Sequence, residues 1–138
     1  MFDNFMVTEP VIPAPEPEQL VTLWAKSIAA GTYPDYFTPN NERSMAAGKV
    51  GGNDRVFIVA KGGGPRVVVH DAWNGDSLGT LQNPADLGSA AGYFKLNAVD
   101  VSEDGIIFAS NMTLTADASN PFTVYRWDKE AATPVEVI

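Results

Sequence analysis

Short runs of apolar residues, separated by clusters of Gly, Pro, Asn and Asp, follow one another along most of this chain. The pattern becomes regular from Arg43 onwards, and within several runs apolar and polar side chains alternate. Short strands with turn signals between them are typical of an all-β protein. We therefore predict strands at residues 55–60, 66–71, 77–81, 96–101, 106–110, 122–127 and 135–138.

The segments between these strands carry the residues that turns require. Asn74-Gly75 is the strongest short hairpin signal. Residues 61–65 hold three glycines and a proline, and Asp104-Gly105 ends another turn. Residues 82–92 are predicted to form a longer loop.

The start of the chain has a different composition. Residues 1–19 contain four prolines, four acidic residues and no Lys or Arg. Alternating prolines favour extended backbone without internal hydrogen bonds. We predict an acidic leader or linker at residues 1–19, followed by one domain at residues 20–138. The alternative is an arm that packs Phe2, Phe5 and Val7 on that domain.

Residues 20–27 are rich in β-branched and aromatic side chains, which favours a strand over a short amphipathic helix at residues 18–30. Residues 31–41 contain two prolines and two asparagines, so we predict a loop there. We expect Tyr33, Tyr36 and Phe37 to anchor this loop on the core.

The later part of the chain resembles the earlier part. The matches pair residues 56–58 with 106–108 at an offset of 50, and residues 70–71 and 78–81 with 127–128 and 135–138 at an offset of 57. Four-stranded units of about 40–50 residues are typical of β-propeller blades. The predicted fold is therefore all-β, with propeller-like blades of four antiparallel strands in an incomplete ring. A β-sandwich with an accidental repeat is the alternative.

These segments also resemble a known family. The matching motifs are Leu23-Trp24-x-Lys26-Ser27, Pro34 with Phe37, Glu42-Arg43, residues 55–59, Asp71-Ala72-x-x-Gly75, Leu78-Gly79-x-Leu81, and residues 96–105, 111–113 and 121–128. Over residues 20–138 the chain is similar to bacterial secreted β-propeller proteins recorded as a domain of unknown function. The resemblance implies this fold and an extracellular or cell-surface location, and it implies no activity. Members of that family carry further blades.

Two blades cannot close a ring, because propellers need about four to eight. An isolated pair leaves two apolar blade faces uncovered, and such faces associate. We expect a fragment of a longer propeller, whose partners are other blades of a longer chain or a further copy bound through an open blade face. The alternatives are a ring of several copies, and a partial propeller in which residues 20–27 add an outer strand.

Composition and charge exclude several classes of function. Nine Lys and Arg stand against 17 Asp and Glu among 138 residues, so the formal net charge is −8, which argues against nucleic acid and anionic membranes. Without Cys and with one His, the chain has no thiolate or multi-histidine metal site. No apolar run approaches the ~18 residues of a membrane span, and no signal peptide is evident. We predict no cofactor, no metal and no membrane span.

Polar residues near the ends of inner strands are the candidate ligand-binding residues. In propellers such residues line the axial channel, an argument from fold alone, and structural hydrogen bonding is their commoner role. Trp73 lies in a turn, where we expect an exposed ring that can stack on carbohydrate. The candidate set is Arg43, Asn97, Asp100, Asn111 and Trp73.

Other features indicate structure rather than chemistry. His70 is next to Asp71, and a histidine oriented by an acid can act as a base, but no nucleophile is placed near it. The glycines at residues 62–64 lack the pattern of a phosphate-binding loop. Asp54 and Asp104 are turn acids without the spacing of a calcium-binding loop, and Trp127 is expected in the core.

The function we predict is a non-catalytic binding or scaffold module of a secreted or surface β-propeller, with a carbohydrate or protein ligand and no catalytic residue assigned. The alternatives are a propeller-type hydrolase or lyase, and an oligomeric sugar-binding propeller. An enzyme of that kind needs a dense cluster of Asp, Glu, His or Asn on the channel, and the sequence shows none.

Overall fold

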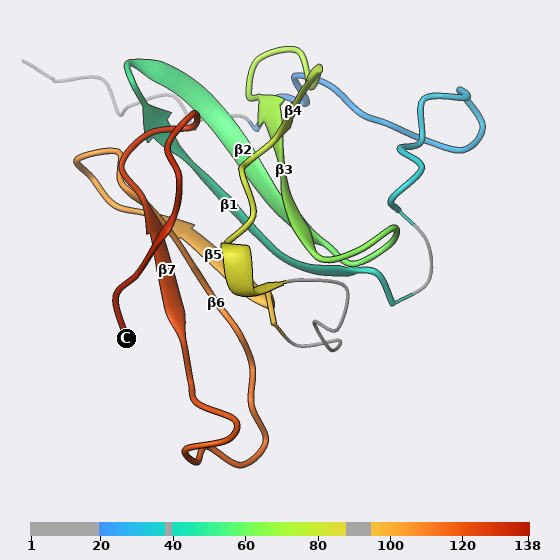
Figure 1. Ribbon diagram of the computed structural model, residues 1–138. Coiled ribbons are helices and arrows are strands. Elements are labelled where there is room, and N and C mark those ends of the chain that lie inside the picture. Colours follow the sequence, from blue (N-terminus) through green and yellow to red (C-terminus); the bar gives the residue numbers. More distant parts are fainter. Residues whose placement is uncertain (1–19, 38–39, 88–94) are drawn as a thin grey trace, which may run out of the picture.

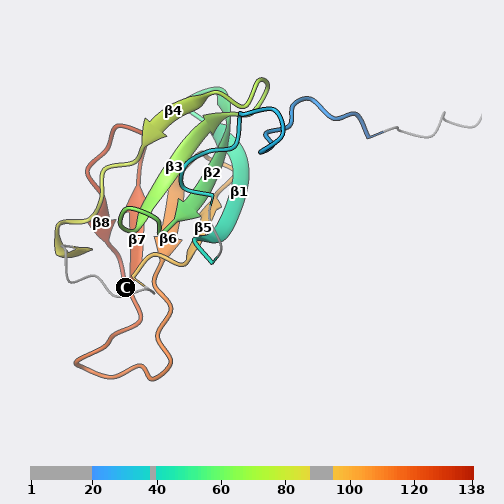
Figure 2. The same cartoon turned by 90° about the vertical axis from the view of Figure 1, so that its right-hand side faces the viewer.

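The computed structural model describes residues 20–37, 40–87 and 95–138, and these residues form two antiparallel four-stranded sheets (Figures 1 and 2). Within these ranges there is no α-helix, and hence none that could cross a membrane. The predicted all-β class is confirmed. In each sheet the strands lie in sequence order. Sheet A contains β1 (Glu42–Val50), β2 (Asn53–Ala60), β3 (Arg66–Asp71) and β4 (Ser77–Thr80), and sheet B contains β5 (Ala98–Val101), β6 (Ile107–Ser110), β7 (Val124–Trp127) and β8 (Val135–Glu136).

One predicted strand is wrong, and the observed strand β1 was not predicted. Residues 20–27 form no strand, and the chain turns at residues 28–31 instead. The segment is held by a side chain, because the Trp24 indole N–H donates to the carbonyl of Ala72 (2.9 Å). β-branched residues favour a strand only where a neighbouring strand can pair with them. The predicted leader at residues 1–19 lies outside the described residues, as do residues 88–92 of the predicted loop at residues 82–92.

The two sheets share one hydrophobic core. Alternate residues of β2 and β3, namely Phe57, Val59, Val67 and Val69, pack against alternate residues of β5, β6 and β7. Trp127 is fully buried there, as predicted, and its indole N–H donates to the carbonyl of Gln82 (2.9 Å). Each large apolar side chain buried in this way stabilises the fold by about 1.5–3 kcal/mol. The members of sheet B in this core are Val99, Ile107, Ala109, Tyr125 and Trp127.

The first strands of the two sheets, β1 and β5, lie against each other and run in the same direction (Figure 1). The amide of Val99 donates to the Ser44 hydroxyl (3.2 Å), and further along both strands Gly48 meets Val101. A Cβ on Gly48 would lie 2.7 Å from the Cβ of Val101. A side chain at this position would therefore force the strands apart.

The sheets consequently stack front to back. We call the face of sheet A that contacts sheet B its front face. Strand β5 lies beside β1, runs in the same direction, and begins a sheet with the same strand order. The two sheets therefore face the same way, so the front face of sheet B, which corresponds to the front face of sheet A, points away from sheet A. The outer ends also correspond, since the Thr133 hydroxyl before β8 donates to the side chain of Gln82 after β4 (3.2 Å).

Strand pairing corrects the predicted internal match by one residue in two places. Phe57 pairs with Val69, and Phe108 pairs with Arg126. If β7 keeps its predicted offset of 57 from β3, β6 must match β2 at 51 rather than 50, which puts Phe108 and Arg126 at the front-face positions of Phe57 and Val69. Because Val135 pairs with Arg126 as Gly79 pairs with Val69, β8 matches β4 at 56 rather than 57. A slip of one residue moves a side chain to the opposite face of a sheet.

The back face of sheet A is covered by the preceding segment. Tyr36 packs with Ile58, Ala60 and Val68, and Phe37 lies against this cluster. The predicted anchoring role of Tyr36 and Phe37 is thus confirmed, while Tyr33 is 44% exposed and touches the ring of Phe37.

Gly105 provides a test of the stacking. Its φ is +81°, and a Cβ there would lie 2.8 Å from the carbonyl oxygen of Lys49 in the other sheet. We expect Gly105→Ala to lower the free energy of unfolding by about 3 kcal/mol, because backbone strain and overpacking add. Urea unfolding measures this change.

Gly52→Ala is the matched control. Its φ is +84°, and no atom lies within 4 Å of the added Cβ. This substitution should cost about 1 kcal/mol, the backbone contribution alone. Equal losses for the two variants would contradict the close approach of the sheets.

Candidate functional site

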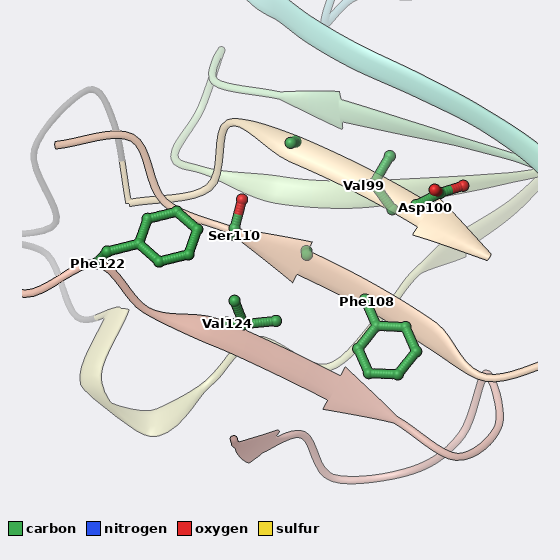
Figure 3. Close-up of a pocket in the computed structure, with 8 residues that line it drawn as sticks. Val99, Asp100, Phe108, Ser110, Phe122 and Val124 are labelled. Carbon is green, nitrogen blue, oxygen red and sulfur yellow. The ribbon is translucent and has the colours of Figure 1, made fainter. Parts of the chain in front are cut away.

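Among the described residues, the front face of sheet B is partly open, with Phe108, Ser110 and Val124 half-buried on it. It carries a shallow groove of about 310 Å³, lined mainly by residues of β5, β6 and β7. In Figure 3 the rings of Phe108 and Phe122 stand at the two ends of the groove, with Val124 between them. Phe122 is 46% exposed. The lining residues are Ala98, Val99, Asp100, Phe108, Ala109, Ser110, Phe122 and Val124.

Strand register arranges this face in rows. Asp100 pairs with Phe108, which pairs with Arg126, so an acid, an aromatic ring and a base follow one another across three strands. The neighbouring row consists of Ala98, Ser110 and Val124. All six alternate with residues of the shared core and therefore point away from it.

Asp100 and Arg126 can each still form hydrogen bonds on their solvent-exposed side. Asp100 is exposed, and its Oδ1 accepts the amide hydrogen of Val101 (2.8 Å). The Nε of Arg126 donates to Oδ1 of Asp128 (2.7 Å), an ion pair in which both side chains are 45% or more exposed. An exposed pair of this kind contributes little stability. The remaining guanidinium nitrogens of Arg126 can serve a second acceptor.

The structure brings three of the five predicted ligand-binding residues to the groove and places Arg43 and Trp73 elsewhere. Asp100 lines the groove, and Asn97 and Asn111 adjoin its end. The Asn111 amide bonds the carbonyl of Pro121 (2.8 Å) and the amide of Thr123 (2.9 Å), so it holds its own loop. Arg43 lies at a bulge of β1, where its buried Nε has no hydrogen-bond partner. Trp73 is 65% exposed in the turn after β3.

Sequence reasoning missed Phe108, Arg126 and Val124 as site residues. The available signal was that residues 106–110 and 122–127 carry apolar side chains on both faces, although one face alone can point to the shared core. A binding role for the five predicted residues stays a prediction.

The single histidine is committed to structure. His70 is 2% exposed, its Nδ1 donates to the carbonyl of Gly75 (3.0 Å), and its Nε2 bonds the Tyr36 hydroxyl. The ring of Trp24 stacks over it at a centroid distance of 6.5 Å. Both imidazole nitrogens are therefore occupied, and the ring is not placed to act as a base.

The turn residues also bond within the chain. Asp54 accepts from Lys49 (2.8 Å) and from the Trp73 indole (3.1 Å), and these hydrogen bonds lower its pKa. The hydroxyl of Ser102 likewise lowers the pKa of Asp104. Within the described ranges, no three His, Cys, Asp or Glu side chains are grouped to hold a metal ion.

Comparisons with protein families, curated proteins and solved structures found no match for this chain. The candidate site is therefore defined by its geometry.

The burial of the Tyr36 hydroxyl predicts a pH dependence of stability. Burial, with a further contribution from nearby Asp35, raises the pKa of Tyr36 to about 12, whereas in the unfolded chain the phenol ionises near pH 10. Between these values the unfolded state has lost the proton that the folded state keeps. Stability from this group is thus complete below pH 10 and is lost as the pH rises toward 12.

We expect the free energy of unfolding of the native chain to fall by about 1–2 kcal/mol more than that of Tyr36→Phe between pH 10 and 12. Urea unfolding at several pH values measures both curves. Parallel curves would show that Tyr36 ionises freely in the folded chain.

Proposed function

We propose that this chain is a non-catalytic binding or scaffold module built from two β-propeller-type blades, with the front face of sheet B as its contact surface. Three features support the blade relationship. The sheets have the same strand order, their first strands lie side by side in parallel, and they stack front to back. Consecutive blades of a propeller are related in this way, whereas two sheets packed front to front are not.

The observation that carries the proposal is a difference between two equivalent faces. Phe57 and Val67 on sheet A correspond in register to Phe108 and Val124 on sheet B. Phe57 is completely buried between the sheets, while Phe108 borders the open groove. An apolar face of this kind on one side of a stack fits an interaction surface.

The groove favours binding over catalysis. Asp100 is the one ionisable residue among the eight that line it. General acid–base chemistry needs a second group with a matched proton affinity within hydrogen-bond reach. The secreted location and the further blades of a longer chain stay expectations from the family resemblance.

Substitution of the two equivalent phenylalanines tests the proposal. Phe57→Ser should lower the free energy of unfolding by about 4 kcal/mol, because a buried ring is replaced by a cavity and a hydroxyl. Phe108→Ser should cost about 1 kcal/mol, because the open face loses little packing. It should also reduce the fluorescence of the apolar dye anilinonaphthalene sulfonate, measured in dilute solution where each particle is one chain.

Leu114→Ser is the control for surface hydrophobicity, since Leu114 is 83% exposed outside the groove. If Phe108→Ser destabilised the chain as much as Phe57→Ser, the front face of sheet B would already be covered within the folded chain. The proposed contact surface would then not exist.

A further inference from the structure

We infer that the partner of this front face is a second copy of the chain, docked about a two-fold axis that runs along the strands. The inference rests on the proposed function, because it names the occupant of the same surface. It follows from the order of the charged residues across this face and from which sheet faces of another copy are open.

The row formed by Asp100, Phe108 and Arg126 is self-complementary. When a copy of the row is turned end for end, its acid faces the base and its base faces the acid. A two-fold axis along the strands turns one face onto the other and reverses the order across the strands. Asp100 then lies opposite Arg126 of the partner subunit, and the two Phe108 rings meet at the centre. A two-fold contact uses the same patch on both chains, so the pair of opposite charges forms twice.

The second row fits the same operation. Its order of Ala98, Ser110 and Val124 places the small Ala98 opposite the larger Val124 of the partner subunit, and the two Ser110 hydroxyls opposite each other. Phe122 borders this row and extends the apolar area. Size and charge are therefore both matched under one axis.

Front-to-back stacking of copies is disfavoured. The back face of sheet A, which would have to meet the front face of sheet B in such a stack, is occupied by Trp24 and Tyr36 of the same chain. The back face of sheet B is buried against sheet A. Among the described residues, the front face of sheet B is thus the one of the four sheet faces that another copy leaves open.

Arg126 has to meet two carboxylates in this arrangement. Its Nε is bonded to Asp128, and its terminal nitrogens are directed to Asp100 of the partner subunit. Guanidinium has five N–H donors in a planar fork, so both acceptors can be served at once. The charges of Asp100 and Arg126 are therefore paired when the interface excludes water.

Sedimentation equilibrium of the full chain and four variants tests the inference. We expect a dimer for the native chain, and a dissociation constant raised at least about tenfold by Asp100→Arg or by Arg126→Asp, because each places like charges opposite each other. The double variant carrying both changes should return to within about threefold of the native value, because the reversed row is again complementary to itself. Asp128→Asn should leave the dimer in place.

Two controls match the change in net charge. Glu103→Arg and Lys129→Asp alter exposed residues outside the two rows, and neither should affect the dissociation constant. If the partner had a different sequence, reversing both charges on this chain would not restore its binding.

Each other result overturns the second-copy inference. A native chain that stays monomeric at every concentration, while the dye still detects Phe108, leaves the open contact surface standing and removes the second copy as its occupant. A dimer that survives both single reversals uses another surface. A double variant as weak as the single ones shows that Asp100 and Arg126 do not meet.

Discussion

The contact between β1 and β5 determines how the two sheets are arranged. Gly48 and Gly105 bring the backbone of one sheet to the other at distances that no side chain permits. This contact sets the first strands of the two sheets side by side and in parallel. The parallel direction, combined with the common strand order, makes the stack front to back, so that a single core is built from opposite faces of two similar sheets. Apolar burial supplies most of the stability, but the glycines decide its geometry.

A front-to-back stack has two ends that differ. At the sheet A end, Tyr36 and Trp24 close the back face over His70, and the imidazole is held by two hydrogen bonds. At the sheet B end, the groove beside Phe108 is open in the part of the chain that the structure describes. Among the described residues, the molecule therefore has one closed end and one open end. An open end of this kind agrees with the proposed binding role better than with reaction chemistry, because the histidine is buried at the other end.

Alternation and turn chemistry were sufficient to predict seven of the eight strands to within two residues, because runs such as residues 55–60 are flanked by clear turn signals. They were insufficient for the site, because cross-strand neighbours depend on hairpin length, and an error of one residue moves a side chain to the opposite face. Asp100 was predicted from its polarity, while Phe108 was not, since an apolar residue in a strand has the appearance of core. Asn111 was predicted by the same polarity, yet its amide bonds its own loop.

The open face differs from the buried one in a way that suits a reversible contact. At the positions where sheet A packs Ala46 and Val69 against the shared core, sheet B carries Asp100 and Arg126, while phenylalanine is kept at the centre of both rows. A wholly apolar face would promote unselective association or aggregation, and flanking charges oppose this because an unmatched partner leaves them desolvated and unpaired. The central ring retains the apolar area that a matched partner can bury. In the proposed contact, affinity and selectivity would therefore be carried by different residues of one row, and this division would account for the three types of side chain in it.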